Sequence, residues 1–298
     1  MKHVIEAEKL VKKFGKFTAV DQLDINLLPG ETLGLLGPNG AGKTTTIGMM
    51  IGLLKPTEGK IEVLGESDPT QISVRKQIGV APQALSIYDE LTAEENLSFF
   101  GKLYKLSGAH LKSRVEWALE FSRLQDRRKS RVGTFSGGMK RRLNFACALV
   151  HEPKIVLLDE PTVGVDPQSR NHIFEGVEQL QQQGLSIIYT THYMEEAERL
   201  CNRVAIIDHG KLLELDSVEN LIGRHGGESL VTGELQAVPD KVSLPGKSVE
   251  HSWRYQTNEP IEEVAKLTNL GVRFKNLQIN QPDLESVFLT LTGRSLRD

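Results

Sequence analysis

Eight consecutive residues have the types and spacing that bind phosphate groups: Gly37-Pro38-Asn39-Gly40-Ala41-Gly42-Lys43-Thr44. Glycines let a backbone wrap around an anion with its N–H groups turned inward. The helix expected from Lys43 onward, which includes Thr45, would point its positive N-terminal end at the phosphates. Lys43 supplies a mobile cation for the β- and γ-phosphates, and the Thr44 hydroxyl can take one position on octahedral Mg²⁺. A chance glycine turn is the alternative, but the apolar run before the segment and the helix after it favour a nucleotide site.

Two acids end the apolar run Ile155-Val156-Leu157-Leu158, which has the length and composition of a buried strand. Asp159 at that strand end can hold Mg²⁺ through water. Glu160 would lie at the carboxyl edge of the sheet, where nucleotides sit in open α/β sheets, and is a candidate general base. The pair favours an ATPase over a kinase, because a kinase deprotonates the hydroxyl of its own substrate. An ordinary solvated strand end is the alternative.

A second anion-binding feature lies upstream of the acidic strand. Ser136-Gly137-Gly138 opens a helix and leaves backbone N–H groups at a helix N-terminus. One nucleotide has no need of two such sites from one subunit, so this segment makes sense if it serves the ATP of a partner subunit. The basic residues that follow, Lys140-Arg141-Arg142, are expected to be a solvated helix face rather than a nucleic-acid patch.

With these motifs in this order, residues 1 to about 225 resemble the ABC ATPase family. Segment 135–139 resembles the signature motif of that family, with Phe135 in place of the usual leucine. The resemblance assigns four more roles: Gln83 matches the glutamine loop that senses Mg²⁺, His192 the switch histidine that contacts the γ-phosphate, Asp166 the loop that crosses the dimer interface, and Phe14 the aromatic that stacks on adenine.

The resemblance implies a mechanical cycle with ATP and Mg²⁺ as cofactors. Two chains would arrange head to tail, each ATP lying between the phosphate loop of one chain and Ser136-Gly137-Gly138 of the other. Glu160 would activate water, while His192 and Lys43 would stabilise the charge that develops on the γ-phosphate. The metal would be contacted by three residues: Thr44, Gln83 and Asp159. The interface would close on ATP and open after hydrolysis.

Strand-like and helix-like segments alternate through most of the chain, which predicts an α/β fold with a largely parallel sheet. The resemblance makes this a phosphate-loop, RecA-like ATPase core with an antiparallel β subdomain. Between about 85 and 150 the pattern is helical alone, which indicates an inserted helical subdomain. Residues 1–225 are therefore expected to form the ABC ATPase domain. Residues 226–298 would form a small C-terminal α/β accessory domain with two or three weak strands and a closing helix.

The composition suits a soluble globular protein. The 298 residues are 39% hydrophobic and 25% charged, and the formal net charge of -3 gives no global attraction to nucleic acid. Two distant cysteines, Cys147 and Cys201, fit a reducing compartment. No apolar run approaches the length of about 18 residues that crosses a membrane, and acids stand where a signal peptide needs apolar residues. We expect a cytoplasmic chain with no nucleic-acid partner.

Two interpretations of the ATP-driven cycle compete. The chain is either the ATP-binding subunit of a membrane transporter with its permease on separate chains, or a soluble ABC ATPase acting in translation or DNA maintenance. Repair and chromosome types insert a long coiled coil between phosphate loop and signature, but Lys43 and Ser136 are less than a hundred residues apart. Translation types carry two cassettes in one chain, and this chain has one. Transport is favoured, with the chain peripheral on the inner face of the cell membrane, as a homodimer or paired with a similar ATPase subunit.

Weaker signals favour export of a drug, antibiotic or lipid-like compound over import. The stretch from Pro282 to Gly293, with Arg297, resembles the C-terminal tail of ATPase subunits of bacterial drug and antibiotic exporters. Residues 84–92 add apolar side chains after Gln83 and border, in family terms, the groove that receives a permease helix; local packing is the alternative. A third class is a regulator that binds ATP without hydrolysing it. The presence of both Glu160 and His192 argues against this class. The transported compound is selected by the permease and has no signal here.

Overall fold

The computed structural model describes residues 3–249 and 251–293, so Arg297 lies outside the described residues. Contacts between residues divide the chain into two compact units, Met1–Val218 and Glu219–Asp298. The sequence predicted the boundary near residue 225. The difference is one short helix, α8 (Val218–His225), which groups with the second unit.

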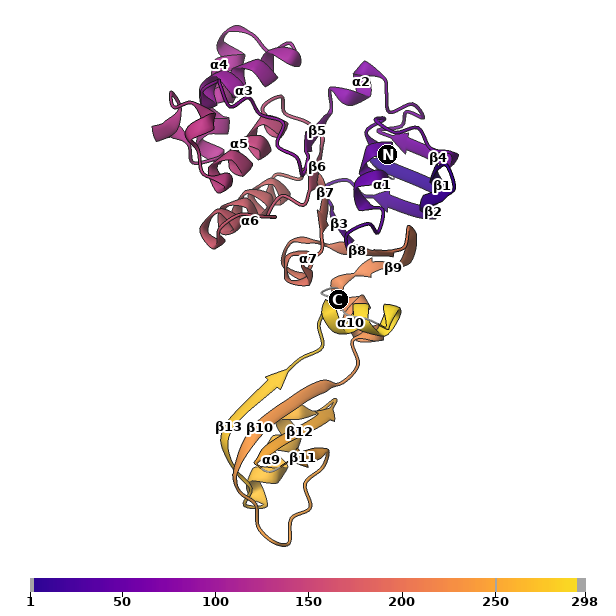
Figure 1. Cartoon of the computed structure of the whole chain (residues 1–298), viewed down its shortest axis with the longest axis vertical. Coiled ribbons are helices and arrows are strands. Elements are labelled where there is room, and N and C mark those ends of the chain that lie inside the picture. Colours follow the sequence, from indigo (N-terminus) through magenta and orange to yellow (C-terminus); the bar gives the residue numbers. More distant parts are fainter. Residues whose placement is uncertain (1–2, 250, 294–298) are drawn as a thin grey trace. The chain divides into compact units, whose positions relative to one another are not determined.

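A six-stranded sheet forms the centre of the first unit, in the order β5-β6-β7-β3-β8-β9 (Figure 1). Five strands run parallel and β9 pairs antiparallel with β8. Every residue of β3, β6 and β7 is buried, as expected for parallel strands that are covered on both faces. The strands are β3 (Thr32–Leu36), β5 (Ile78–Ala81), β6 (Ile155–Asp159), β7 (Ser186–Thr191), β8 (Arg203–Asp208) and β9 (Lys211–Ser217).

An antiparallel sheet in the order β2-β1-β4 lies on one side of this centre (Figure 1). Its strands are β1 (Ile5–Phe14), β2 (Phe17–Leu27) and β4 (Glu58–Val63). The helix after β3, α1 (Lys43–Met50), contributes Ile47, Met49 and Met50 to a core shared by both sheets. This packing holds the second half of α1 in place. The short helix α2 (Ile72–Arg75) precedes β5.

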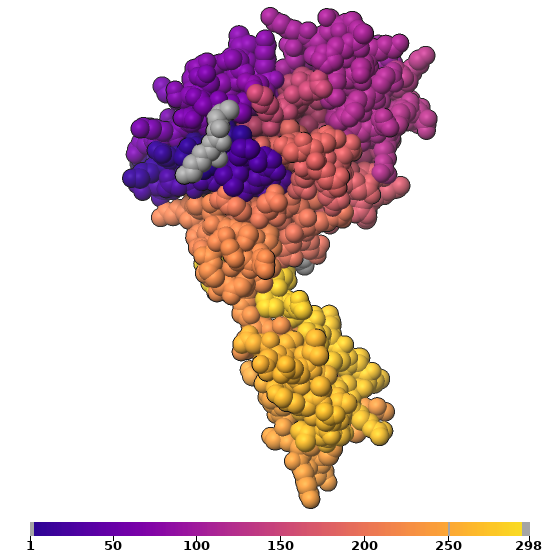
Figure 2. Space-filling model, turned by 180° about the vertical axis from the view of Figure 1, so that it is seen from behind, coloured from indigo at the N-terminus to yellow at the C-terminus, as the bar shows by residue number. Residues whose placement is uncertain are grey.

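A block of helices lies between β5 and β6 in the chain, as predicted for residues 85–150. It contains α3 (Ala93–Leu103), α4 (Gly108–Phe121) and α5 (Gly137–Leu149), with short turns at Gln125–Arg127 and Val132–Thr134. Thr92 and Glu95 form a reciprocal capping box at the start of α3, which explains why the helix begins there. The block has its own core, including Leu97, Leu119 and Leu143. Figure 2 shows the block in magenta and the N-terminal sheet in indigo on opposite sides of this unit.

Two more helices complete the first unit and begin just after the carboxyl ends of central strands. They are α6 (Pro167–Gln182), which follows β6, and α7 (Met194–Leu200), which follows β7. Because neighbouring parallel strands end at the same sheet edge, the loops after β3, β6 and β7 meet there. The fold thus gathers the phosphate loop, the acidic pair and His192.

The second unit is a four-stranded antiparallel sheet in the order β11-β12-β10-β13, with helices. Four strands are present where the sequence predicted two or three. Trp253 is fully buried among Val231, Leu267 and Val272, and its indole N–H donates to the Pro245 carbonyl at 2.7 Å. Besides α8, the elements are β10 (Ser229–Ala237), β11 (Lys247–Val249), β12 (Ser252–Thr257), α9 (Pro260–Asn269), β13 (Arg273–Asn280) and α10 (Leu284–Thr292).

Over the described residues, no helix combines the length and the apolar character needed to span a bilayer.

Candidate functional site

The phosphate loop joins the buried end of β3 to the first turn of α1. Gly42 precedes the helix with a φ of 104°, a conformation that side-chain-bearing residues rarely adopt. A Cβ atom on Gly42 would lie 2.6 Å from the Ala19 carbonyl oxygen of β2. Glycine is therefore required here for two independent reasons. A hollow of about 400 Å³ opens over the loop, lined by residues 39–45 together with Phe17, Ala19, Gln83 and Glu160.

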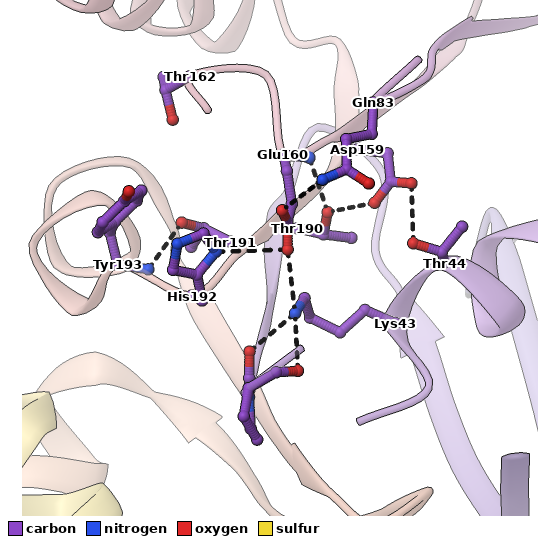
Figure 3. Close-up of polar contacts among 12 residues, drawn as sticks. Lys43, Thr44, Gln83, Asp159, Glu160, Thr162, Thr190, Thr191, His192 and Tyr193 are labelled. Carbon is purple, nitrogen blue, oxygen red and sulfur yellow. Dashed lines mark hydrogen bonds and ion pairs between the residues drawn. The ribbon is translucent and has the colours of Figure 1, made fainter. Parts of the chain in front are cut away.

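Lys43 and Glu160 meet at the floor of this hollow (Figure 3). The ammonium of Lys43 lies 3.2 Å from Glu160 Oε1, and both side chains are buried. The same ammonium donates to the carbonyl oxygens of Gly37 at 2.8 Å and Pro38 at 3.1 Å. A buried cation with three oxygen partners, two in the phosphate loop and one on Glu160, is held ready to meet an anion that enters the hollow.

Asp159 is held by two hydroxyl donors. Thr44 Oγ1 donates to Oδ2 at 3.0 Å, and Thr190 Oγ1 donates to Oδ1 at 2.6 Å. The Thr44 hydroxyl and the Asp159 carboxylate are hard oxygen ligands, the kind that Mg²⁺ prefers. Both lie at the end of the phosphate loop (Figure 3). The donor set fits the predicted metal. Among the described residues no cluster of three His, Cys, Asp or Glu side chains could hold a metal on its own, so such an ion would complete its shell with water and phosphate.

Glu160 is the point at which the predicted residues converge. Gln83 Nε2 donates to Glu160 Oε2 at 3.0 Å, and His192 Nδ1 lies 3.4 Å from Oε1 (Figure 3). The Glu160 backbone has a φ of 46°, a strained value for a residue with a side chain, and its N–H donates to Thr190 Oγ1 at 2.9 Å. Strain of this kind persists where the surroundings hold a residue in position. Here it places the carboxylate between Lys43 of the phosphate loop and His192.

Thr190 was missed by the sequence analysis, although it contacts both acids. Its hydroxyl donates to Asp159 and accepts from the Glu160 backbone. The sequence did offer a signal that could have found Thr190, because this threonine lies near the end of β7, the strand that pairs with β6 and its terminal acid. Because β6 and β7 are parallel, Asp159 faces Thr190 in the register of the sheet.

Ser136, Gly137 and Gly138 do not line the hollow around Lys43. The Ser136 hydroxyl instead caps α5 by accepting from the Met139 N–H at 3.3 Å. Asp166 likewise caps α6 by accepting from the Ser169 N–H at 2.9 Å, and this backbone bond is the main reason why the Asp166 pKa is lowered. In a single chain, the phosphate loop and the helix N-terminus at Ser136 are therefore separate. Their shared use of one ATP stays a prediction for two chains.

The expectation for Lys140-Arg141-Arg142 was wrong at Arg141, which is buried rather than solvated. Its guanidinium donates to the carbonyl oxygens of Gln83 at 2.7 Å, Pro82 at 3.4 Å and Val163 at 3.3 Å. Burial lowers the Arg141 pKa, and the charges of the acidic pair oppose that shift. Helical periodicity would have placed position 141 on the buried side of α5. Arg141 ties the signature helix to the backbone of the glutamine loop and of the loop after Glu160.

Phe17 lines the hollow of the phosphate loop, whereas the predicted adenine contact, Phe14, does not. The two rings stand at the ends of one tight turn, because β1 and β2 pair Phe14 with Phe17. Both are exposed, Phe14 by 49% and Phe17 by 63%. The ammonium of Lys12 lies 5.2 Å from the centre of the Phe14 ring. Adenine stacking on Phe14 stays a prediction, and the structure adds Phe17 as a second candidate.

Comparisons with known proteins match the chain along its length. Residues 20–163 match the family model described as ABC transporter. The linearmycin resistance ATP-binding protein of Bacillus subtilis is 41% identical, covering 99% of this chain and 100% of its own length. A Nod factor export ATP-binding protein of Cupriavidus metallidurans is 39% identical, with full coverage of both. The solved dimeric structure of a bacterial ABC transporter cassette is 25% identical, with a TM-score of 0.66 over 72% of this chain and 98% of that one.

Proposed function

The chain belongs to the ABC transporter family as an ATP-binding subunit with ATPase activity, and from this premise we propose that it drives export through membrane subunits on separate chains. The observation that carries the catalytic part is the convergence of Lys43, Gln83 and His192 on the Glu160 carboxylate. The predicted α/β fold and the predicted family are both confirmed.

Glu160 is the proposed general base. Its carboxylate accepts the proton of the water that attacks the γ-phosphate, and the Gln83 amide holds one of its oxygens in a fixed direction. Lys43 and His192 both contact the other oxygen, Oε1. When ATP is bound, they can leave this contact and stabilise the charge that develops on the phosphoryl oxygens. Gln83 therefore orients Glu160 through Oε2, while Lys43 and His192 contact Oε1.

Mg²⁺ is proposed to bind beside Thr44 and Asp159, with Gln83 as the third residue near it. When bound, the ion neutralises charge on the β- and γ-phosphates. The residues of this chain prepare that site, since Thr190 orients the Asp159 carboxylate and the fold of the phosphate loop orients Thr44.

A head-to-tail dimer is the proposed working form. The helix N-terminus capped by Ser136 does not reach the hollow of its own chain, so it is available to the ATP of a second chain. The dimeric cassette with the same fold supports this arrangement. Whether both chains are copies of this one or one is a similar ATPase is decided by the transporter.

The face proposed to meet the permease follows the glutamine loop. Tyr88 and Phe99 form an edge-to-face pair with ring centres 5.0 Å apart, and 47% and 37% of their surfaces are exposed. Leu85 is also partly exposed. These apolar side chains follow Gln83 in the chain and could pass the movement of an apolar permease segment to the site. The same contact would hold the chain at the inner face of the membrane.

The proposal of export rests on two full-length relatives, one named a Nod factor export ATP-binding protein and the other a linearmycin resistance ATP-binding protein. We propose an antibiotic or lipid-like cargo for this chain too. Action as a soluble ATPase in translation or DNA maintenance is not favoured by any relative reported above.

Co-purification tests the proposal. The chain is expressed with the membrane proteins encoded beside its gene, membranes are solubilised, and ATP hydrolysis of the isolated complex is measured. A polytopic membrane protein that co-purifies and stimulates hydrolysis is the expected result. A matched Glu160→Gln complex should co-purify equally and release phosphate at least about a hundredfold more slowly. Co-purification with ribosomes or DNA instead would contradict export and leave the ATPase chemistry standing.

A further inference from the structure

A fully buried carboxylate outside the hollow joins several segments of the site. Glu196 of α7 has no exposed surface, and its two oxygens accept four hydrogen bonds. Oε1 accepts from Thr162 Oγ1 at 2.7 Å and Arg170 Nε at 3.0 Å. Oε2 accepts from Tyr189 Oη at 3.0 Å and Thr191 Oγ1 at 2.8 Å. A buried carboxylate is tolerated only with such complete pairing, because a buried polar atom without a partner is costly.

The partners of Glu196 come from the segments that carry the two central residues of the proposed reaction. Thr162 lies two residues after Glu160, on the loop that leads to Asp166. Thr191 lies immediately before His192. Each oxygen of Glu196 thus serves one side of the site, and the two sides are linked through a single carboxylate.

The orientation of Thr191 depends on this charge. Its hydroxyl donates to Glu196. The same hydroxyl accepts from the backbone N–H of Tyr193 at 2.9 Å (Figure 3). The hydroxyl therefore fixes the backbone on both sides of His192. Tyr189 also remains a donor, because burial and then the Glu196 charge hold the pKa of its phenol well above the ordinary value.

We propose that Glu196 is a positioning residue that sets the placement of His192 relative to Glu160. This rests on the proposed function, in which those two residues act on the γ-phosphate. Glu196 touches neither of them by any hydrogen bond described above, and it acts through Thr191 and Thr162. Replacing it with glutamine would put an amide N–H₂ where an oxygen now accepts two donors, so one pair of partners loses its geometry.

The test is a double-mutant cycle on the full chain with Glu196→Gln and His192→Ala, measured as ATP turnover and as KM for ATP. The neighbouring Glu195→Gln is the matched control, because the Glu195 side chain is 81% exposed and lies 3.8 Å from the same Arg170. We expect E196Q to lower kcat about tenfold to a hundredfold with KM within about twofold, as for a small misplacement of a reacting group. E195Q should match the wild type.

The cycle separates positioning from simple stabilisation. If Glu196 acts through His192, E196Q lowers kcat in the wild-type background and has little further effect in H192A. Equal losses in both backgrounds would overturn the proposal. If H192A itself turns over ATP normally, the proposed role of His192 fails; if H192A is impaired and E196Q is normal, only the positioning role fails.

A second pair of variants covers the case in which E196Q does not fold. Thr191→Val removes the hydroxyl link to Glu196 while keeping the shape of the side chain, and Thr191→Ser restores the link. We expect T191V to lower kcat without adding to H192A, and T191S to recover most of the activity. Equal activity of T191V and T191S would contradict the proposal.

Discussion

The carboxylate of Glu160 lies 3.2 Å from the ammonium of Lys43, and both side chains are buried. A pair so removed from water would be costly if it served only stability. Its partners, the carbonyl oxygens of the phosphate loop on one side and Gln83 on the other, connect it to the elements that bind nucleotide. The contact is best understood as a preformed site in which each charge can be exchanged for a phosphate or a water.

Glu160→Gln should abolish turnover while keeping ATP binding. Glutamine keeps an oxygen and the size of the side chain but cannot take a proton from water, so phosphate release should fall by about a hundredfold or more. ATP should then accumulate in a dimer, measured by size-exclusion chromatography with light scattering. Glu178→Gln on the surface of α6 is the control and should hydrolyse ATP normally. Wild-type turnover in the Glu160 variant would remove this residue from the reaction.

Arg141→Met should weaken both the fold and the catalytic site. Three backbone carbonyl oxygens lose a charged donor, and we expect a loss of about 2–3 kcal/mol in the free energy of unfolding. Because one of those carbonyls belongs to Gln83, kcat should fall as well. Lys140→Met is the matched control, since Lys140 pairs with Asp89 at the surface and should cost under about 1 kcal/mol. Chemical denaturation and ATP turnover measure the two effects, and equal costs for both variants would contradict this role.

Gly138→Ala should destabilise the chain through a contact within one subunit. A Cβ atom there would lie 2.0 Å from Ser169 Oγ and 2.6 Å from Ser169 Cβ, so we expect a cost of about 1–3 kcal/mol. Ser169→Gly removes both atoms and should recover part of that cost in the double variant. Additive costs in a denaturation cycle would show that the two residues are not coupled. The result would separate packing from any contact of Gly138 with ATP.

The core of the fold and the central site were predictable from sequence because their signals are local. Gly37 to Thr44 and the acids after β6 carry the chemistry in consecutive residues, and parallel pairing of β6 with β7 then brings Thr190 to Asp159. Arg141 and Glu196 were not predictable in this way. A buried charge looks like a surface residue in sequence, and several of its partners are more than twenty residues away: the Gln83 and Val163 carbonyls for Arg141 and the Thr162 hydroxyl for Glu196.

The short turn between β1 and β2 shows a second limit. Phe14 and Phe17 are both exposed aromatic residues at the ends of the same turn, and only the three-dimensional arrangement shows that Phe17 lines the hollow. The boundary near residue 225 was shifted for a similar reason, because the side on which α8 packs is decided by tertiary contacts.

Comparison of Phe14→Ala with Phe17→Ala identifies the ring that binds adenine. Base stacking on an aromatic ring contributes about 1–3 kcal/mol, so loss of the correct ring should raise the KM for ATP about fivefold to a hundredfold with little change in kcat. The other variant is the internal control. If the base lies in the hollow that Phe17 lines, Phe17→Ala should raise the KM. If the base stacks on Phe14, as the family resemblance implies, Phe14→Ala should raise it instead. Unchanged KM in both variants would exclude stacking on this turn.

His151 should make the stability of the chain depend on pH. It is buried and stacked on Tyr104 with ring centres 3.5 Å apart, and its Nε2 bonds the Ile78 carbonyl at 3.1 Å, whereas Nδ1 has no hydrogen-bond partner among the described residues. Burial lowers its pKa from 6.5 to about 4. The unfolded chain therefore binds the proton first as pH falls, and stability present above pH 6.5 is lost progressively toward pH 4.

The size of this loss follows from the shift and is about 3 kcal/mol. His151→Gln keeps an N–H donor and cannot titrate, so the variant should lose less stability than the wild type between about pH 7.5 and about pH 5, an interval that includes the unfolded pKa of 6.5. Denaturation midpoints at the two pH values measure the difference. His110→Gln, at an exposed histidine that pairs with Glu152, is the control and should keep the pH dependence of the wild type. An unchanged slope in the His151 variant would assign the acid sensitivity to other groups.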